Sequence, residues 1–329
     1  MCTSALYFTG PRTVQARPLA LDPLADGEVL VETAASAISA GTELLVYRDQ
    51  TPENMVIDEA LTGFEGDFTY PMQYGYAAVG QVVETGSDVE ADWLGQTVFS
   101  FTPHQTQFTA SPEELVSVPD GMAPAHATLL PTLETATNLV LDCHPRLGEH
   151  VVVFGAGIVG LCVTRLLAAF PLESLVVVDP LDNRRAIARE MGADRAIHPD
   201  AVAQTVSDVD LAVELSGQPD VLNDALGVVG YDGRIVIGSW YGAKQTAVDF
   251  GGRFHRNRIE LISSQVSTID PELRGRWDKD RRFETALGWL ERIDPDRLIS
   301  HRIPFSEAQD AYELLDQQPE PVLQVVMTY

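Results

Sequence analysis

The stretch HVVVFGAGIVG, residues 150–160, decides the fold. An apolar strand runs directly into Gly155, and helical apolar spacing follows over residues 158–169. A Gly-x-Gly-x-x-Gly pattern between a strand and a helix predicts a βαβ unit that binds a dinucleotide. Gly155 allows the tight turn, Gly157 lets the backbone approach a pyrophosphate, and Gly160 lets the helix pack closely on the strand.

The rest of this unit indicates which dinucleotide is bound. The first helical residues, Ile158 and Val159, offer N–H groups and a partial positive charge to the phosphates. The second strand ends in Asp179, whose carboxylate accepts hydrogen bonds from ribose hydroxyls and repels a 2′-phosphate. We therefore expect NAD as cofactor rather than NADP, a preference that the nearby Arg184 and Arg185 soften. The alternative is a glycine-rich turn that binds nothing, with Asp179 as a helix cap.

The pattern of predicted secondary structure differs before and after residue 150. Up to about residue 120, short apolar runs separated by Gly, Pro and Asp turns predict β structure. After His150, strands alternate with helices, which predicts a parallel sheet. The expected strands of that sheet are 150–154, 175–179, 210–215, 233–238 and 259–264. The fold class is therefore α/β, and the final run PVLQVVMTY reads as one more strand.

The composition excludes several partners. The 329 residues hold 48 acids against 22 Lys and Arg, a formal net charge of −26. The only lysines are Lys244 and Lys279. This charge repels nucleic acid and anionic lipid. Acids spread along the chain with so few lysines favour a halophilic protein that stays hydrated in a salt-rich cytoplasm, with ordinary solubility charge as the alternative.

Targeting and membrane segments are also not expected. The opening residues MCTSALYFTGPR lack a basic segment followed by an apolar run, as a signal peptide would have. No window reaches the roughly 18 apolar residues of a membrane span. We therefore expect a soluble, cytoplasmic protein that acts on a small molecule.

Three segments carry a resemblance to a known superfamily: SAISAGTELLVYR (36–48), YPMQYGYAAVGQVVETG (70–86) and GRIVIGSWYG (233–242). With them, nearly the whole chain resembles a medium-chain dehydrogenase/reductase, in the branch of the bacteriochlorophyllide hydroxyethyl dehydrogenases. The resemblance implies a GroES-like catalytic domain at 1–131 and 267–329 and a Rossmann doubly wound domain at 132–266. It also implies a homo-oligomer, either a dimer or a tetramer.

The zinc ligands of that superfamily are replaced in this chain. The resemblance places Ala40 at the first ligand position, Tyr76 at the second, and a residue near Pro131 at the third. Glu134 is a nearby candidate for the third ligand. Between Cys2 and Cys143 there is no cysteine, so the four-cysteine structural zinc lobe is missing as well. Since zinc needs three or four N, S or O ligands, we expect no metal.

Without zinc, other groups must handle the proton that accompanies hydride transfer. The resemblance places Thr42 at the proton-relay hydroxyl, Glu43 at the acid beside it, and Tyr76 where its phenol reaches a carbonyl oxygen. Each has a structural alternative: Thr42 satisfying its loop, Glu43 stabilising a helix first turn, and Tyr76 filling the volume of a zinc site. For His104 we favour a surface or core position over an acid/base role.

Further residues are expected around the cofactor. By the same resemblance, Thr135 lies beside the nicotinamide ring, and Trp240 and Tyr241 line its pocket. An apolar loop is a candidate substrate cover, with ordinary packing under a loop as the alternative; its residues are Leu61, Phe64 and Phe68.

Three functions follow from these features. The first is a zinc-independent, NAD-linked oxidoreductase that interconverts a secondary alcohol and a ketone. The second is reduction of an activated carbon–carbon double bond. The third is a dinucleotide-binding redox sensor that has lost catalysis, which the missing zinc ligands favour and the otherwise continuous motifs disfavour.

Overall fold

The computed structural model describes residues 3–52, 67–318, 320 and 322–329. The chain folds into two compact units. Unit 1 comprises Met1–Pro131 with Asp294–Tyr329, and unit 2 comprises Thr132–Ile293. Residues 267–293 therefore belong to unit 2, whereas the sequence expectation placed them with the first domain.

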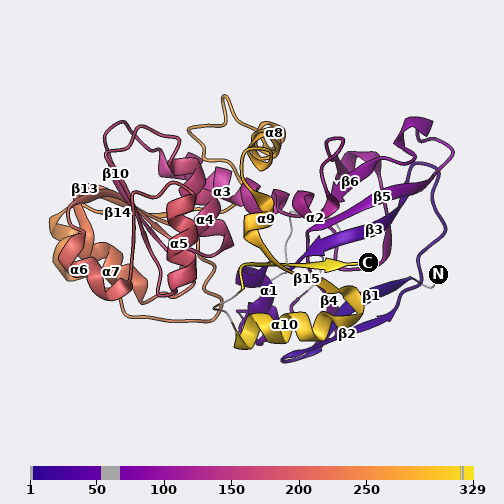
Figure 1. The fold of residues 1–329 in the computed structure, drawn as a ribbon, viewed down its shortest axis with the longest axis horizontal. Coiled ribbons are helices and arrows are strands. Elements are labelled where there is room, and N and C mark those ends of the chain that lie inside the picture. The colour runs from indigo at the N-terminus through magenta and orange to yellow at the C-terminus, as the bar shows by residue number, and fades with distance from the viewer. Residues whose placement is uncertain (1–2, 53–66, 319, 321) are drawn as a thin grey trace. The chain divides into compact units, whose positions relative to one another are not determined.

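Unit 2 is built on one parallel sheet (Figure 1). Its strands are β9 (His150–Phe154), β10 (Ser174–Val178), β11 (Arg195–Ile197), β12 (Val209–Glu214), β13 (Val229–Ile237) and β14 (Glu260–Ser263). Its helices are α3 (Leu130–Cys143), α4 (Ile158–Leu167), α5 (Asp182–Glu190), α6 (Val202–Thr205), α7 (Val221–Val228) and α8 (Lys279–Leu290), with short turns η3 (Pro199–Ala201) and η4 (Phe250–Phe254).

The order of these strands is β11-β10-β9-β12-β13-β14, the doubly wound Rossmann order. Strand β9 lies at the centre, and Val151, Val152 and Val153 are all fully buried. A strand covered on both faces is apolar at every position, which is why this run does not alternate. The strands expected from the sequence are confirmed as β9, β10, β12, β13 and β14. The short β11 was not expected.

Unit 1 contains the β-rich part of the chain. Its strands are β1 (Ser4–Gly10), β2 (Thr13–Pro18), β3 (Val29–Ala37), β4 (Met72–Gln73), β5 (Ala78–Thr85), β6 (Thr97–Ser100), β7 (Gln107–Ala110), β8 (Leu115–Ser117), β15 (Ile299–Pro304) and β16 (Gln324–Thr328). Its helices are α1 (Ala40–Tyr47), α2 (Pro124–Ala127), α9 (Pro295–Leu298) and α10 (Ala308–Gln317), with short turns η1 (Ala91–Trp93), η2 (Pro112–Glu114) and η5 (Phe305–Glu307).

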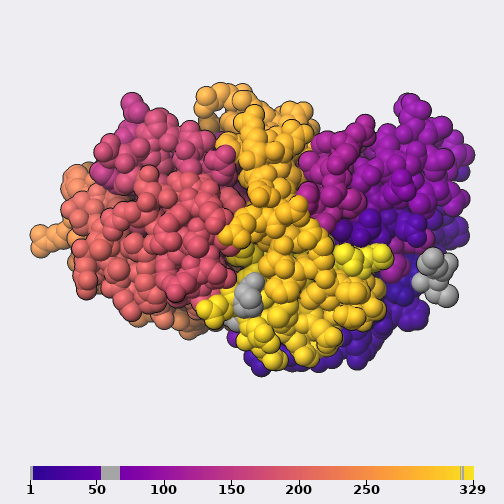
Figure 2. All heavy atoms as spheres, viewed as in Figure 1, coloured from indigo at the N-terminus to yellow at the C-terminus, as the bar shows by residue number. Residues whose placement is uncertain are grey.

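Both ends of the chain contribute to the sheets of unit 1. The smaller sheet has the order β2-β1-β4, and the larger has the order β15-β16-β3-β5-β6-β8 with β7 paired to β3. Strand β16 pairs with β3 antiparallel, so the predicted last strand returns to the first part of the fold. Helix α10 packs against β2, and the yellow C-terminal surface adjoins the indigo N-terminal surface (Figures 1 and 2).

A buried arginine explains why the segment after residue 266 belongs to unit 2. Arg282, on α8, is 1% exposed and donates to Glu134 Oε1 on α3 at 2.5 and 3.0 Å. It also donates to the backbone oxygens of Val266 at 2.6 Å and Thr268 at 3.2 Å. Burial raises the pKa of the Glu134 carboxyl, and the charge of Arg282 opposes this rise. The ion pair thus fastens α8 and the preceding loop to α3.

Replacing Arg282 with methionine should lower the free energy of unfolding by about 3–5 kcal/mol, because Glu134 would stay buried without its partner. Urea denaturation at neutral pH measures the change. The matched double variant R282M/E134L replaces both charges with apolar groups and should recover most of the loss. Equal stability of the two variants would contradict this account.

A second ion pair lies at the amino end of β9. Arg234 donates to both carboxylate oxygens of Glu149 at 2.8 Å, and also to the backbone oxygens of Cys143 and His144. Burial of Glu149 opposes its ionisation, but hydrogen bonds from Arg234 and from the Arg146 N–H outweigh this effect and lower the pKa of the carboxyl. The pair ties the end of α3 to two strands of the sheet.

This lowered pKa gives the ion pair a defined pH dependence. The folded pKa lies below the unfolded value of about 4.3, so Glu149 stabilises the fold above that pH and loses its effect as pH falls through the folded pKa. We expect Glu149→Gln to be less stable than the wild type at pH 7, and the difference to vanish in acid. Unfolding titrations of both proteins from pH 7 to pH 3 measure it. A difference that stays constant with pH would rule out the carboxylate as its source.

Candidate functional site

The glycine turn follows β9 at the carboxyl edge of the parallel sheet. Gly155 has φ +98°, a conformation that other residues rarely adopt. A Cβ on Gly155 would lie 2.6 Å from the Leu215 backbone oxygen and 2.8 Å from Ser216 Cα, so the loop after β12 touches the turn. Strands β9 and β12 flank the point where the strand order reverses. In open α/β sheets, this crevice is where ligands bind.

The other two glycines have contrasting surroundings. A Cβ on Gly160 would lie 1.9 Å from the Gly155 backbone oxygen, so this glycine permits the close packing of α4 on the turn. A Cβ on Gly157 would meet nothing within 4 Å. Gly157 is the N-cap of α4, and Ile158 and Val159 open the helix, half-buried. The turn therefore has an open side, where helix N–H groups fit a pyrophosphate.

Asp179 follows β10 directly and is joined to this turn. Its Oδ2 accepts the Ala156 N–H at 2.8 Å, and its Oδ1 accepts the Leu181 N–H at 2.9 Å. A carboxylate offers about four acceptor positions, so two remain for hydroxyl donors. The structure thus brings Gly155, Gly157, Gly160 and Asp179 together, an arrangement that fits a dinucleotide.

Two arginines on α5 lie around Asp179. Arg185 donates to the Asp179 backbone oxygen at 2.6 Å and forms an ion pair with Asp182. Burial lowers the pKa of the Arg184 guanidinium, and the Asp179 charge opposes this shift. Arg184 is therefore close enough to feel the charge of the carboxylate that would contact the ribose.

The loops after β12 and β13 are linked to each other beside the glycine turn. Glu214, at the end of β12, is fully buried. Its Oε1 accepts the N–H of Ser216 at 2.7 Å and the Ser216 hydroxyl, and its Oε2 accepts the Tyr241 phenol at 2.5 Å. Lys244 Nζ donates to the Gly217 backbone oxygen at 2.7 Å. Burial, with the hydrogen bond to Glu214 and its charge, raises the pKa of Tyr241, which keeps the phenol protonated.

The expected nicotinamide-side residues lie near these loops. Trp240 is half-buried in the loop after β13. Thr135 is half-buried on α3, one helical turn before Leu139. The Leu139 side chain packs against Gly238, just after β13, since a Cβ on Gly238 would lie 2.5 Å from it. The buried Glu214 was not identified from the sequence, although its position at the end of an apolar strand was visible.

In unit 1, the structure brings two of the predicted catalytic residues together. The Tyr76 hydroxyl hydrogen-bonds Ser39 Oγ and lies 3.3 Å from Thr42 Oγ1. Ser39 is the N-cap of α1, and Thr42 lies in the first turn of that helix. All three residues are half-buried. We call them the hydroxyl cluster. Such hydroxyls can pass a proton from one to the next.

Glu43 faces the core instead of this cluster. It is fully buried and accepts three donors: the Ser39 N–H at 2.6 Å, His104 Nε2 at 3.0 Å and the Tyr312 phenol. Its bond to the Ser39 backbone fixes the start of α1, which carries the hydroxyl cluster. Glu43 thus positions the start of α1, and its own side chain is not exposed.

His104 extends this buried network. It is fully buried, as expected of a core histidine, and its Nδ1 lies 2.8 Å from Ser36 Oγ, which in turn lies 2.8 Å from the Tyr329 hydroxyl. A consistent set of donors has Tyr329 donating to Ser36, Ser36 to His104 and His104 to Glu43. Gly75, with φ +102°, lets the chain pass the imidazole, since a Cβ there would lie 2.3 Å from Nε2. This close approach places the following residue, Tyr76.

Burial raises the pKa of both terminal phenols of the network, Tyr312 and Tyr329, and the Glu43 charge adds to the rise. Both phenols therefore remain protonated donors. Ser39, Tyr312 and Tyr329 were not singled out from the sequence. Of the expected substrate loop, Leu61 and Phe64 lie outside the described residues, and Phe68 packs edge-on against Tyr74 at 5.8 Å.

The residues at the expected zinc positions do not fit a metal. Ala40 and Pro131 have no donor side chain, and Glu134 is occupied by Arg282. Within residues 3–52, 67–318, 320 and 322–329, no three His, Cys, Asp or Glu side chains lie close enough together to hold a metal ion. Of the side chains at the expected positions Ala40, Tyr76 and Pro131, only the Tyr76 phenol offers a donor atom, whereas zinc needs three or four ligands.

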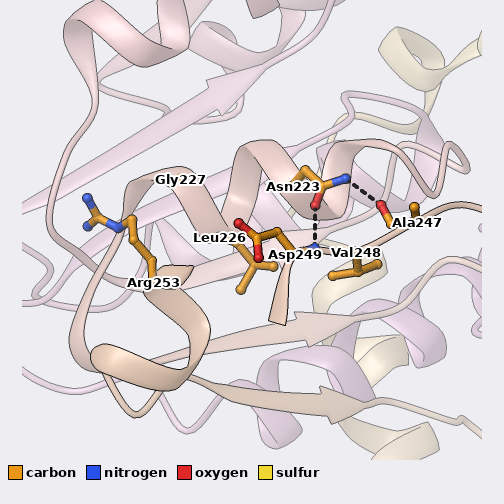
Figure 3. Close-up of a pocket in the computed structure, with 7 residues that line it drawn as sticks. All are labelled: Asn223, Leu226, Gly227, Ala247, Val248, Asp249 and Arg253. Carbon is orange, nitrogen blue, oxygen red and sulfur yellow. Dashed lines mark hydrogen bonds between the residues drawn. The ribbon is translucent and has the colours of Figure 1, made fainter. Parts of the chain in front are cut away.

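A separate surface pocket of about 550 Å³ lies beside α7 (Figure 3). Asn223 spans it, donating to the Ala247 backbone oxygen at 2.9 Å and accepting the Asp249 N–H at 3.1 Å. No residue of the glycine turn lines this pocket, so it is distinct from the candidate cofactor site.

In the described part of the chain, no helix is both long and apolar enough to cross a bilayer.

Comparison with known proteins finds dehydrogenases. The sequence model of a family described as zinc-binding dehydrogenases matches residues 159–285. The D-guloside 3-dehydrogenase of Escherichia coli K12 is 25% identical over 98% of this chain and 99% of its own length. The 2-desacetyl-2-hydroxyethyl bacteriochlorophyllide A dehydrogenase of Cereibacter sphaeroides is 27% identical over 97% of this chain and 96% of its own. Because the identity to this second enzyme is low, membership of the bacteriochlorophyllide hydroxyethyl dehydrogenase branch stays a proposal.

Solved structures share the whole fold. A short chain alcohol dehydrogenase from Escherichia coli CFT073, complexed with NADH, has a TM-score of 0.79 at 18% identity and covers 99% of each chain. A zinc-binding-type dehydrogenase from Sinorhizobium meliloti, bound to NADP, has a TM-score of 0.80 at 17% identity and covers 100% of each. The fold is thus α/β, with a GroES-like unit and a Rossmann unit. In sequence and in fold, the chain is thus similar to dehydrogenases of the zinc-binding type.

Proposed function

We propose that this protein is an NAD-linked oxidoreductase that interconverts a secondary alcohol and a ketone without zinc. The observation that carries the proposal is the hydrogen bond that joins the glycine turn to the buried Asp179. The open side of the turn at Gly157 fits a pyrophosphate, and the Asp179 carboxylate fits ribose hydroxyls. The relatives named as dehydrogenases support alcohol oxidation rather than reduction of a carbon–carbon double bond.

A bound nicotinamide cofactor would supply or accept the hydride. The chain's own share is the proton, and the hydroxyl cluster fits this task. In the direction of reduction, the Tyr76 hydroxyl donates its proton to the carbonyl oxygen, and Ser39 or Thr42 replaces that proton. In oxidation, the substrate hydroxyl gives its proton to the Tyr76 oxygen as Tyr76 passes its own proton to the cluster. Glu43 does not touch the substrate but holds the Ser39 backbone in place.

NAD rather than NADP is proposed on the strength of Asp179. Asp179 is buried and directly follows the second strand of the βαβ unit, where a 2′-phosphate would meet its negative charge. The nearby charge of Arg184 works in the opposite direction. The two solved relatives bind NADH and NADP respectively, so the preference of this chain depends on its own residues.

Titration of the metal-analysed protein with NAD(H) and NADP(H), followed by a screen of secondary alcohols, ketones and enones, tests the proposal. We expect tight NAD(H) binding, turnover of an alcohol or ketone, and unchanged activity after chelation. Stoichiometric zinc needed for turnover would overturn the zinc-independent chemistry. Binding without turnover of any substrate class would favour the redox-sensor hypothesis.

The acidic composition predicts how the protein responds to salt. With a net charge of −26, mutual repulsion of the acids opposes the compact state, and salt screens it over a Debye length of about 3 Å at 1 M. We therefore expect the thermal midpoint to rise as KCl increases from 0.1 to 2 M. A midpoint that falls with salt would contradict the proposed halophilic character. Size-exclusion chromatography in the same buffers tests the proposed dimer or tetramer.

A further inference from the structure

Glu214 differs from the other buried glutamates of unit 2 in what surrounds its carboxylate. Glu134 pairs with Arg282, and Glu149 pairs with Arg234. The donors to Glu214 are the N–H and hydroxyl of Ser216 and the phenol of Tyr241, all of them neutral. Within the residues that the structure describes, no arginine or lysine forms an ion pair with it. Glu214 is thus a fully buried carboxyl group that accepts hydrogen bonds from neutral donors and has no positive charge paired with it among the described residues.

The position of Glu214 in the sheet indicates which part of a bound dinucleotide would lie near its carboxylate. If the dinucleotide binds as proposed, its adenosine ribose meets Asp179 beyond β10 and its pyrophosphate meets the turn after β9. The nicotinamide half then extends to the other side of β9, over the carboxyl ends of β12 and β13, because a dinucleotide spans the two halves of this fold. Glu214 ends β12, and its partner Tyr241 follows β13.

We infer that Glu214 sets the preference of the site for the oxidised over the reduced cofactor, an inference that rests on the proposed function. The nicotinamide ring carries a positive charge in NAD⁺ and none in NADH. A buried carboxylate at the end of β12 would stabilise the oxidised form of a ring bound over that strand, since a low dielectric strengthens its field and water does not screen it. Neutral donors hold the charge in place without cancelling it.

The experiment is to measure Kd for NAD⁺ and for NADH with wild type and Glu214→Gln, at 0.1 and 2 M KCl. The amide keeps the shape and hydrogen-bonding capacity of the carboxylate and removes its charge. The ratio Kd(NAD⁺)/Kd(NADH) should rise roughly three- to thirtyfold, the range expected of one unit charge at an effective dielectric constant of about 20. The rise should persist at 2 M KCl, because salt screens the exposed acids and not a buried one.

One control variant isolates the charge. Glu149→Gln removes another buried acid, at the amino end of the same sheet. It should not raise the ratio. Thermal melts of each variant show that it is folded at the temperature of the titration.

The remaining outcomes separate the inference from the proposed function. Equal losses of NAD⁺ and NADH affinity in Glu214→Gln would mean that Glu214 only holds the loops, and a shift that disappears at 2 M KCl would assign the preference to the surface charge. Either result overturns the inference while leaving the cofactor assignment intact. A wild type that binds neither form would overturn the proposed function and the inference with it.

Discussion

Replacing Tyr76 with phenylalanine should lower kcat by about 10²- to 10⁴-fold, the usual contribution of a positioned acid or base. The ring and its packing remain, so Kd for the dinucleotide should stay within about twofold. The measurement is steady-state turnover of the alcohol or ketone found in the substrate screen, with cofactor binding followed by fluorescence. The pH profile should lose the limb that reports the proton donor.

Thr42→Val is the matched control, because it removes the hydroxyl at 3.3 Å from Tyr76 with little change in volume. It should lower kcat less than Tyr76→Phe, since Ser39 still accepts from the phenol. Unchanged turnover in Tyr76→Phe would show that Tyr76 only fills space, the alternative that the sequence left open.

Replacing Gly157 with alanine should weaken dinucleotide binding roughly 10- to 100-fold without unfolding the protein. A Cβ there meets no atom of the chain within 4 Å, so the methyl group enters the open side where a pyrophosphate would approach. The loss corresponds to one charge-assisted hydrogen bond of about 1.5–3 kcal/mol. Isothermal titration gives Kd, and a thermal melt gives the stability.

Gly160→Ala is the contrasting variant, since its Cβ would lie 1.9 Å from the Gly155 backbone oxygen. It should lower the thermal midpoint as well as the affinity, because α4 must shift away from the turn. If Gly157→Ala bound the cofactor normally, the open side of the turn would not be the pyrophosphate site.

The parallel sheet could be predicted because each of its long strands carries its own signal. Val151 to Val153 are buried on both faces and give a continuous apolar run, and the glycines that follow have a known steric role. Strand β11 has no such signal, because only Ala196 of its three residues is buried. The position of residues 267–293 was also beyond prediction, because it depends on Arg282 reaching Glu134, 148 residues away.

The candidate site was predictable in the same uneven way. Positions tied to a local motif, such as Gly157 and Asp179, could be named from spacing alone. The partners of Glu43 could not, since Tyr312 lies 269 residues further along the chain and only the folded sheet brings it near. A spacing pattern identifies which backbone position carries a functional side chain. The contacts of that side chain depend on burial and on residues far away in the sequence.

The insertion of β16 between β15 and β3 also dictates an order of events on the ribosome. Unit 2 is continuous in sequence, so all of it is synthesised before residues 294–329. At about 5–20 residues per second, those last residues follow within seconds, and until then residues 35–37 of β3 lack the neighbour that β16 provides, while residues 29–32 pair with β7. The hydrogen bonds of Glu43 with Tyr312 and of Ser36 with Tyr329 likewise form only after these tyrosines have been synthesised. The Rossmann unit can thus mature during translation, whereas the unit that carries the hydroxyl cluster is completed only after the final strand has been made.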